Sequence, residues 1–280
     1  MRSSREEFKE ASITSPSPLK GERTSEQFDD VPLASYDDLR IDHITIAVPD
    51  SFIQSPPASL RKHFTIVPGN QSPTRSLAIY FRDGTYLNFE GRPALKHPEY
   101  VGWALTTAAG TRNDHQAMRN RLPGSYQVPV REILVSPGGT EVQWEALRPF
   151  YSSENLLPYW VHDSGPRSQR VRVNDAGITQ HACGALGMET IKFCVKNEDE
   201  EQTRKRFAAV IGVEDEEWVA ATPYPDNAAL ARTTISVRGI DEEYMQRDLM
   251  VEVILKAPEN RVRVFGRLIG KSVAKGLVLF

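Results

Sequence analysis

Six histidines and two cysteines are the side chains in this chain best suited to bind a metal or move a proton near neutral pH. His43 lies in a run of β-branched residues, and His162 ends an aromatic run. Neutral imidazole is a ligand for Zn, Fe, Ni or Mn, and the alternative is a histidine that only hydrogen-bonds. Cys183 and Cys194 form no CxxC pair and support no disulfide framework, so we expect a reducing, cytoplasmic compartment.

The sequence contains none of the motifs typical of several other common enzyme classes. It contains no P-loop, no Gly-x-Gly-x-x-Gly after a strand, no Gly-x-Ser-x-Gly and no His-Glu-x-x-His, so nucleotide chemistry, serine hydrolysis and zincin proteolysis have no support. The net charge of −3 argues against a nucleic-acid partner. The basic run 204–206 follows the acidic run 198–201, which predicts a solvated helix face with i,i+4 pairs. Because no run of about 18 apolar residues occurs, we expect no membrane partner.

The histidines must be positioned by the elements around them. Residues 1–38 are rich in Ser, Pro and charged side chains, and this composition predicts a disordered arm. From 39 to 165 the order strand, helix, strand, strand, strand occurs twice, with the two opening strands about 60 residues apart. In the opening strand, alternation would place residues 41, 43 and 45 on one face. The predicted strands are 41–48, 64–67, 77–81 and 85–90, then 101–107, 126–134, 141–147 and 157–162; the helices are 59–64 and 113–122.

Residues 166–280 read as a third, partial copy followed by a tail. A strand at 188–195 leads to a helix at 200–211 that ends at Gly212, and further strands are predicted at 231–237 and 248–255. In the first copy, the apolar runs on either side of Asp83-Gly84 predict a hairpin with a tight turn.

Five blocks of residues carry a family resemblance, and they occur in the family's order. They are Ile41–Asp50, Ile79–Leu87, Gly102–Leu105, Leu157–Val161 and His181–Gly187. Over roughly residues 40–215 the chain resembles glyoxalase-like domains of the vicinal-oxygen-chelate superfamily. The resemblance implies an α+β fold in which repeated βαβββ modules form a half-open barrel, here with a partial third module. Members of the family include isomerases, lyases, dioxygenases and non-enzymatic binders, so the fold does not define the reaction.

The resemblance also implies a set of site residues. In the family, the position of His43 is commonly a ligand of a divalent metal, here Zn, Fe, Mn or Ni. The ligand expected from the hairpin is replaced by Asn88, with Glu90 two residues further on the same face of the strand. Trp103, which cannot bind a metal, stands at the second module's equivalent of His43, and His162 replaces a closing glutamate. The implied metal set is therefore His43, His162 and Glu90, with Glu90 as third ligand or general base.

Three functional hypotheses remain open. The first is a metal-dependent lyase, isomerase or dioxygenase that acts on a small oxygenated molecule. The second is a metal-free protein that binds a small molecule in the same cleft, with Asn88 and Trp103 as ligand contacts. A third hypothesis, an interaction module, would use the N-terminal arm or the tail for docking. Arg167 and Arg170 are either arginines that reach a carboxylate at the cleft mouth or ordinary surface residues. Since modules of this family pair within or between chains, a homodimer is also compatible with the resemblance.

Overall fold

The computed structural model describes residues 38–69, 75–135, 141–150, 156–224, 231–245 and 249–257, together with the backbone of a short strand at 277–279. All of them belong to one compact unit, residues 32–280. The predicted arm at 1–38 lies outside the described residues except for its last residue, and so does most of the C-terminal tail.

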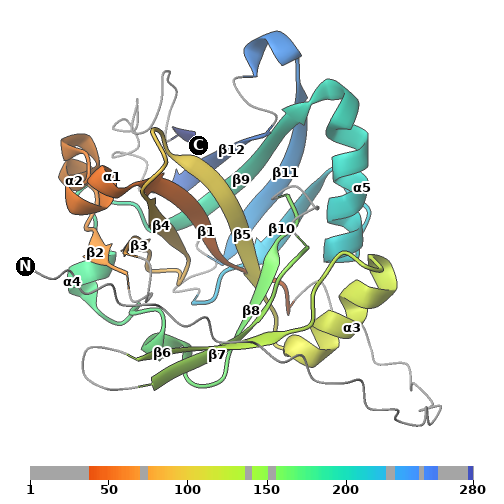
Figure 1. Cartoon of the computed structure of the whole chain (residues 1–280), viewed down its shortest axis with the longest axis horizontal. Helices are drawn as coiled ribbons and strands as arrows, with labels where there is room; N and C mark the ends of the chain where they lie inside the picture. Colours follow the sequence, from red (N-terminus) through yellow and green to blue (C-terminus); the bar gives the residue numbers. More distant parts are fainter. Residues whose placement is uncertain are drawn as a thin grey trace, which may run out of the picture. The chain divides into compact units, whose positions relative to one another are not determined.

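The first module has the order strand, helices, strand, strand, strand (Figure 1). Its opening strand β1 runs parallel to β4, and antiparallel pairs then give the strand order β1-β4-β3-β2. The predicted hairpin is present, with Phe81 N–H donating to Thr85 O at 2.9 Å and Gly84 at φ +85°. The elements are β1 (Arg40–Pro49), α1 (Asp50–Gln54), α2 (Ala58–His63), β2 (Val67–Pro68), β3 (Ser76–Tyr80) and β4 (Tyr86–Arg92).

The second module repeats this arrangement. β5 runs parallel to β8, and the strand order is β5-β8-β7-β6. The antiparallel pair β1–β5 joins the two modules through their opening strands. Figure 1 shows α3 beside β7 and β8. The elements are β5 (Glu99–Thr106), α3 (Thr111–Arg121), β6 (Val130–Val135), β7 (Glu141–Leu147) and β8 (Tyr159–Asp163).

The third module is shorter among the described residues. β9 runs parallel to β11, and β11 pairs antiparallel with β10, a five-residue strand that the sequence analysis did not predict. β12 lies on the other side of β9 and pairs with it antiparallel, as β5 pairs with β1, so it takes the place of the opening strand of a further module. After β8 come η3 (Arg167–Gln169), α4 (Ala176–Thr179), β9 (Gly187–Lys196), η4 (Asn197–Asp199), α5 (Glu200–Ile211), β10 (Glu217–Ala221), β11 (Arg232–Ile240), η5 (Glu242–Tyr244), β12 (Leu249–Lys256) and β13 (Leu277–Leu279).

Helix α5 has the boundaries and the charged face that were predicted. Arg204 and Lys205 pair with the glutamates four residues earlier, each at 2.6 Å. Gly212 ends the helix in the left-handed conformation at φ +91°. Within the described part of the chain, no helix combines the length and the apolar character needed to cross a membrane.

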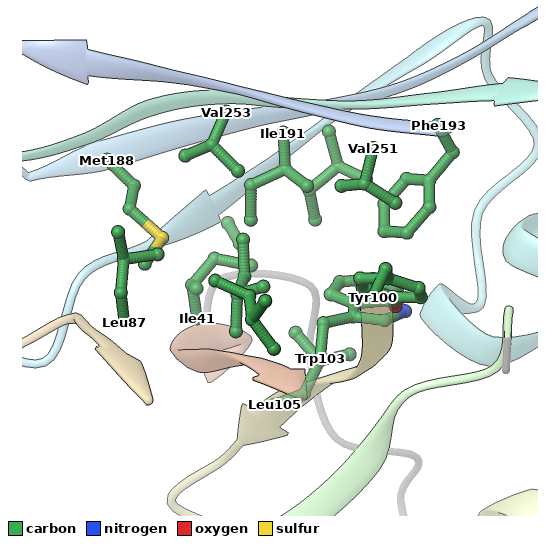
Figure 2. Close-up of a cluster of buried hydrophobic side chains, with 14 of the residues drawn as sticks. Ile41, Leu87, Tyr100, Trp103, Leu105, Met188, Ile191, Phe193, Val251 and Val253 are labelled. Atoms are coloured by element: carbon green, nitrogen blue, oxygen red, sulfur yellow. The ribbon is translucent and has the colours of Figure 1, made fainter. Parts of the chain in front are cut away.

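The main core lies between the first two modules and the sheet formed by β9, β11 and β12. Figure 2 shows apolar side chains of β9 and β12 directed toward those of β1 and β5. Trp103 is fully buried there, with ring centroids 5.1 Å from Phe193 and 5.4 Å from Phe207, and its Nε1–H donates to Leu156 O at 2.8 Å. Burial of such aromatic surface is a large stabilising contribution. Trp103 therefore lies in the core and does not line the cavity in which the metal-free binding hypothesis made it a ligand contact.

Candidate functional site

An irregularity in β1 determines which side chains reach the cleft. The register with β5 shifts between Ile41, which faces Leu105, and His43, which faces Ala104, so Asp42 is the extra residue of a β-bulge. Ile41 and Ile44 both face the core, while Asp42 and His43 lie together on the opposite side. The expectation that residues 41, 43 and 45 share one face is thus wrong for residue 41, because the bulge resets the alternation.

Beyond this face of β1 lies a cavity of about 350 Å³, which is the size of a small-molecule site. Its walls come from both of the first two modules and combine aromatic rings with convergent polar groups. They are formed by His43, Gly69, Tyr80, Tyr86, Asn88, Glu90, Glu132, Ile133, Leu134, Trp144, Arg148, Tyr159, Val161 and Arg170.

His43 is held in this wall through both of its ring nitrogens. Nδ1 lies 2.6 Å from Asp42 Oδ1, and Nε2 is hydrogen-bonded to the hydroxyl of Tyr159. The imidazole stacks on Tyr86 with centroids 4.4 Å apart and an interplanar angle of 18°. Thr45 Oγ1 lies 3.0 Å from Tyr159 Oη and is a second hydrogen-bond partner of this hydroxyl.

Behind His43 lies a buried network of ion pairs. Arg170 donates to Asp42 (Nη2–Oδ2 2.7 Å, Nη1–Oδ1 3.1 Å) and to Asp163 (Nε–Oδ1 2.5 Å, Nη2–Oδ2 3.0 Å). Arg167 also pairs with Asp42, and its Nη2 donates to Gly84 O at 2.9 Å. Both arginines are largely buried, so they are not ordinary surface residues, and the carboxylate that they reach is one of the protein's own.

This network determines the charge of Asp42. Burial by itself would raise the pKa of Asp42, but the charges of Arg167 and Arg170 and the hydrogen bonds from His43 and Arg170 hold it well below its usual range. Burial lowers the pKa of His43, against the opposing effect of Asp42. Burial also raises the pKa of Tyr159. The site at rest therefore holds an ionised Asp42, a neutral His43 and a neutral Tyr159.

Further polar groups line the cavity on β4, the neighbour of β1, and on the second module. Asn88 Nδ2 donates to Glu90 Oε1 at 3.3 Å, and burial raises the pKa of Glu90. Arg148 Nη2 donates to Glu132 Oε1 at 2.7 Å, and the Arg148 guanidinium lies over the Tyr159 ring at 5.1 Å from its centroid. Asn88 and Glu90 thus share the cavity with His43, as the resemblance implied.

His162 does not join this group. Along β8, Tyr159 and Val161 line the cavity, and the alternation of a strand turns His162 to the other face. There its Nε2 lies 2.9 Å from Asp114 Oδ2 on α3. Tyr159, which sequence analysis missed as a site residue, has the cleft position; the alternation of Tyr159 and Val161 was the signal that would have found it.

His181 has a structural role in the linker before β9. Its Nε2 donates to Tyr80 O at 3.0 Å, and its Nδ1 accepts the N–H of Thr65 at 3.2 Å. Burial lowers its pKa to about 4, so the ring is neutral and joins the linker to the first module.

The side chains present do not fit the divalent metal that the sequence resemblance implies. Both nitrogens of His43 are already hydrogen-bonded, and His162 points to α3. Within the described ranges, no three His, Cys, Asp or Glu side chains are grouped so as to hold a metal ion. A zinc or non-haem iron site needs at least three such protein ligands directed at one point.

The arrangement of elements defines the class of this protein. The first two βαβββ modules each have the strand order 1-4-3-2. They are joined through their opening strands and enclose a cleft. This is an α+β fold of repeated βαβββ modules, an open arrangement and not a closed barrel, so the fold class that the resemblance implied is confirmed.

Comparisons with known proteins gave matches only among solved structures, since neither a family model nor a curated protein matches the chain. A hypothetical protein from Staphylococcus aureus is 12% identical, with a TM-score of 0.49 over 72% of this chain and 87% of that one. A xylose isomerase-like TIM barrel/4-hydroxyphenylpyruvate dioxygenase fusion protein is 12% identical, with a TM-score of 0.48 over 86% of this chain and 40% of that one. The Mn(II)-bound glyoxalase from Novosphingobium aromaticivorans is 14% identical, with a TM-score of 0.37 over 71% and 62%. The chain thus spans less than two thirds of the length of the fusion protein and of the glyoxalase.

Proposed function

We propose that this protein binds a small, oxygen-bearing organic molecule in the cleft between the first two modules, through its own side chains and without a bridging metal. The observation that carries the proposal is the hydrogen-bonded state of His43, whose two nitrogens are taken by Asp42 and Tyr159. The cleft thereby offers hydrogen bonds and aromatic surface in place of open coordination positions.

The walls of the cavity indicate the chemistry of the ligand. The indole of Trp144 and the phenol of Tyr159 offer aromatic surface for a planar molecule. Asn88 and Glu90 supply hydrogen-bonding groups on one side, and Arg148 supplies a cation on another. A planar molecule with hydroxyl or carbonyl oxygens fits this combination.

The competing proposal is a metal-dependent lyase, isomerase or dioxygenase with His43, His162 and Glu90 as ligands. It requires His162 to turn from α3 into the cleft, which would reverse the alternation of β8 and separate His162 from Asp114. It also requires His43 to give up one hydrogen-bond partner.

One experiment separates the two proposals. Saturation-transfer NMR with 4-hydroxybenzaldehyde and benzoate is run on protein treated with EDTA, and again after Zn, Fe, Mn or Ni is added. We expect binding in EDTA that added metal does not change. Binding that appears only with metal would favour the metal-dependent enzyme, and no binding under any condition would refute the proposed function.

A matched pair of variants locates the binding. Val161 is buried in the cavity wall, so Val161→Trp fills the cleft and should abolish the NMR signal. Val213→Trp makes the same change at a residue that is 39% exposed outside this cleft, and it should leave binding unchanged. Equal binding by both variants would place the ligand elsewhere.

A further inference from the structure

Three side chains connect the buried ion network to the cleft. Asp42 is fully buried, His43 is nearly so, and Tyr159 is partly exposed. Asp42 contacts His43 Nδ1, and His43 Nε2 contacts Tyr159 Oη, so the three form a continuous hydrogen-bonded chain that ends at the cavity wall.

The positions of the protons in this chain follow from its chemistry. An ionised carboxylate only accepts hydrogen bonds, so His43 carries its proton on Nδ1 and donates it to Asp42. The Nε2 of a neutral imidazole is then an acceptor, and the hydroxyl of Tyr159 is the donor to it. Every proton in the chain is therefore directed from the cleft toward Asp42.

We propose that Asp42, His43 and Tyr159 form a metal-free proton relay that acts on a carbonyl compound bound in the cleft. In the first step, Tyr159 Oη takes a proton from the carbon next to the substrate carbonyl. At the same time, the phenol proton of Tyr159 moves to His43 Nε2. The substrate is left as an enolate, and the imidazolium is stabilised by Asp42. Reversal of the relay returns the proton to another atom of the substrate, so the net reaction is an isomerisation that needs no co-reactant. The inference rests on the proposed binding function.

The surroundings of the relay suit this task. Arg167 and Arg170 keep Asp42 ionised and fix its two oxygens, so the carboxylate is held in place for the imidazolium. The charges of the same arginines lower the pKa of His43, so the imidazolium returns its proton readily. The stacked ring of Tyr86 holds the plane of the imidazole. Since burial raises the pKa of Tyr159, this phenol does not ionise by itself near neutral pH and needs His43 to take its proton. Tyr159 and His43 are the catalytic residues, because both transfer a proton in the step, and Asp42 is a positioning residue.

Benzenesulfonyl fluoride tests the relay without a known substrate. Tyr159 Oη would attack the sulfur, fluoride would leave, and the phenol proton would pass to His43 Nε2. Peptide mapping by mass spectrometry then gives the labelling rate of each tyrosine. In the wild-type protein we expect labelling at Tyr159, reduced about tenfold or more in His43→Gln. The matched control His115→Gln, at a partly exposed residue of α3 that does not line the cavity, should label Tyr159 at the wild-type rate.

The pH profile of labelling separates a relay from a structural hydrogen bond. With the relay, the wild-type rate at Tyr159 should be nearly constant from about pH 7 to about pH 9, because neutral His43 is the base throughout. In His43→Gln only the phenolate reacts, so the rate should rise about tenfold per pH unit. The wild-type profile is decisive even where His43→Gln fails to fold.

Two results would overturn the inference. The first is a wild-type Tyr159 that is not labelled or whose rate rises with each pH unit, and the second is an equal rate in His43→Gln. Either result together with benzoate or 4-hydroxybenzaldehyde binding in EDTA would reject the relay and leave the binding function standing. Loss of that binding would reject the binding function itself.

Discussion

Replacement of Asp83 by asparagine should change how the stability of this protein depends on pH. Asp83 is fully buried in the turn between β3 and β4, where its Oδ1 accepts the N–H of Thr85 at 2.9 Å and its Oγ1–H at 2.7 Å. Its carboxylate lies against Gly187 at the start of β9; a Cβ at that glycine would be 1.8 Å from Oδ2. The charge is thus enclosed where the first module meets the third.

The magnitude follows from the pKa of Asp83. Burial raises this pKa from 3.8 to about 6, against hydrogen bonds from Thr85 and the charge of Lys256. The difference, 6 − 3.8, is about 2.2 units, or about 3 kcal/mol at 1.36 kcal/mol per unit. Because the folded state holds the proton more tightly, the free energy of unfolding should fall by about 3 kcal/mol as the pH rises from about 4 to about 6.

A second buried group hides this effect in the wild-type protein. Burial lowers the pKa of His181 from 6.5 to about 4, so its contribution is present above pH 6.5 and is lost as the pH falls toward 4. The two contributions have opposite signs over nearly the same range. These two contributions therefore largely cancel in the wild-type profile, and only a comparison of variants reveals Asp83.

The assay is urea denaturation of wild type and Asp83→Asn, followed by tryptophan fluorescence at several pH values between about 4 and about 7. The asparagine keeps an oxygen for the Thr85 donors but cannot ionise. The variant-minus-wild-type free energy of unfolding should increase by about 3 kcal/mol across this range. Asp215→Asn, at an exposed residue, is the matched control and should give a constant difference. A constant difference for Asp83→Asn as well would refute the reasoning from burial.

Two further predictions concern other buried groups. His181→Gln removes a contribution that is lost as the pH falls from about 6.5 to about 4, so the variant-minus-wild-type free energy of unfolding should rise by about 3 kcal/mol over this fall, measured by the same urea titration; a constant difference would contradict it. Arg170→Met leaves the carboxylates of Asp42 and Asp163 without their main partner and should cost about 3–5 kcal/mol in thermal unfolding. The control Arg172→Met removes an exposed pair and should cost about 1 kcal/mol or less; similar costs for the two variants would count against the buried network.

Local sequence signals were sufficient for most of the fold. The Asp83-Gly84 turn, the helix that ends at Gly212 and the repeated strand order were all predicted, because turn chemistry, capping and apolar periodicity depend on neighbouring residues. β10 (Glu217–Ala221) was missed because it has one β-branched residue beside a glutamate and two alanines, residue types that are depleted in strands. β12 was predicted as a strand, but its place beside β9 depends on pairing that local signals do not contain.

The site was only partly accessible from the sequence. By itself the sequence placed His43, Asn88 and Glu90 on strands of one module, and the structure pairs these two strands and brings all three side chains to one cavity. Only the tertiary structure decided that the bulge at Asp42 sets this carboxylate beside His43, that Arg170 reaches it across 128 positions of sequence, and that Tyr159 occupies the cleft while His162 faces α3. The physical reason is that register and bulges decide which face of a strand each side chain occupies, and both are set by pairing between distant segments.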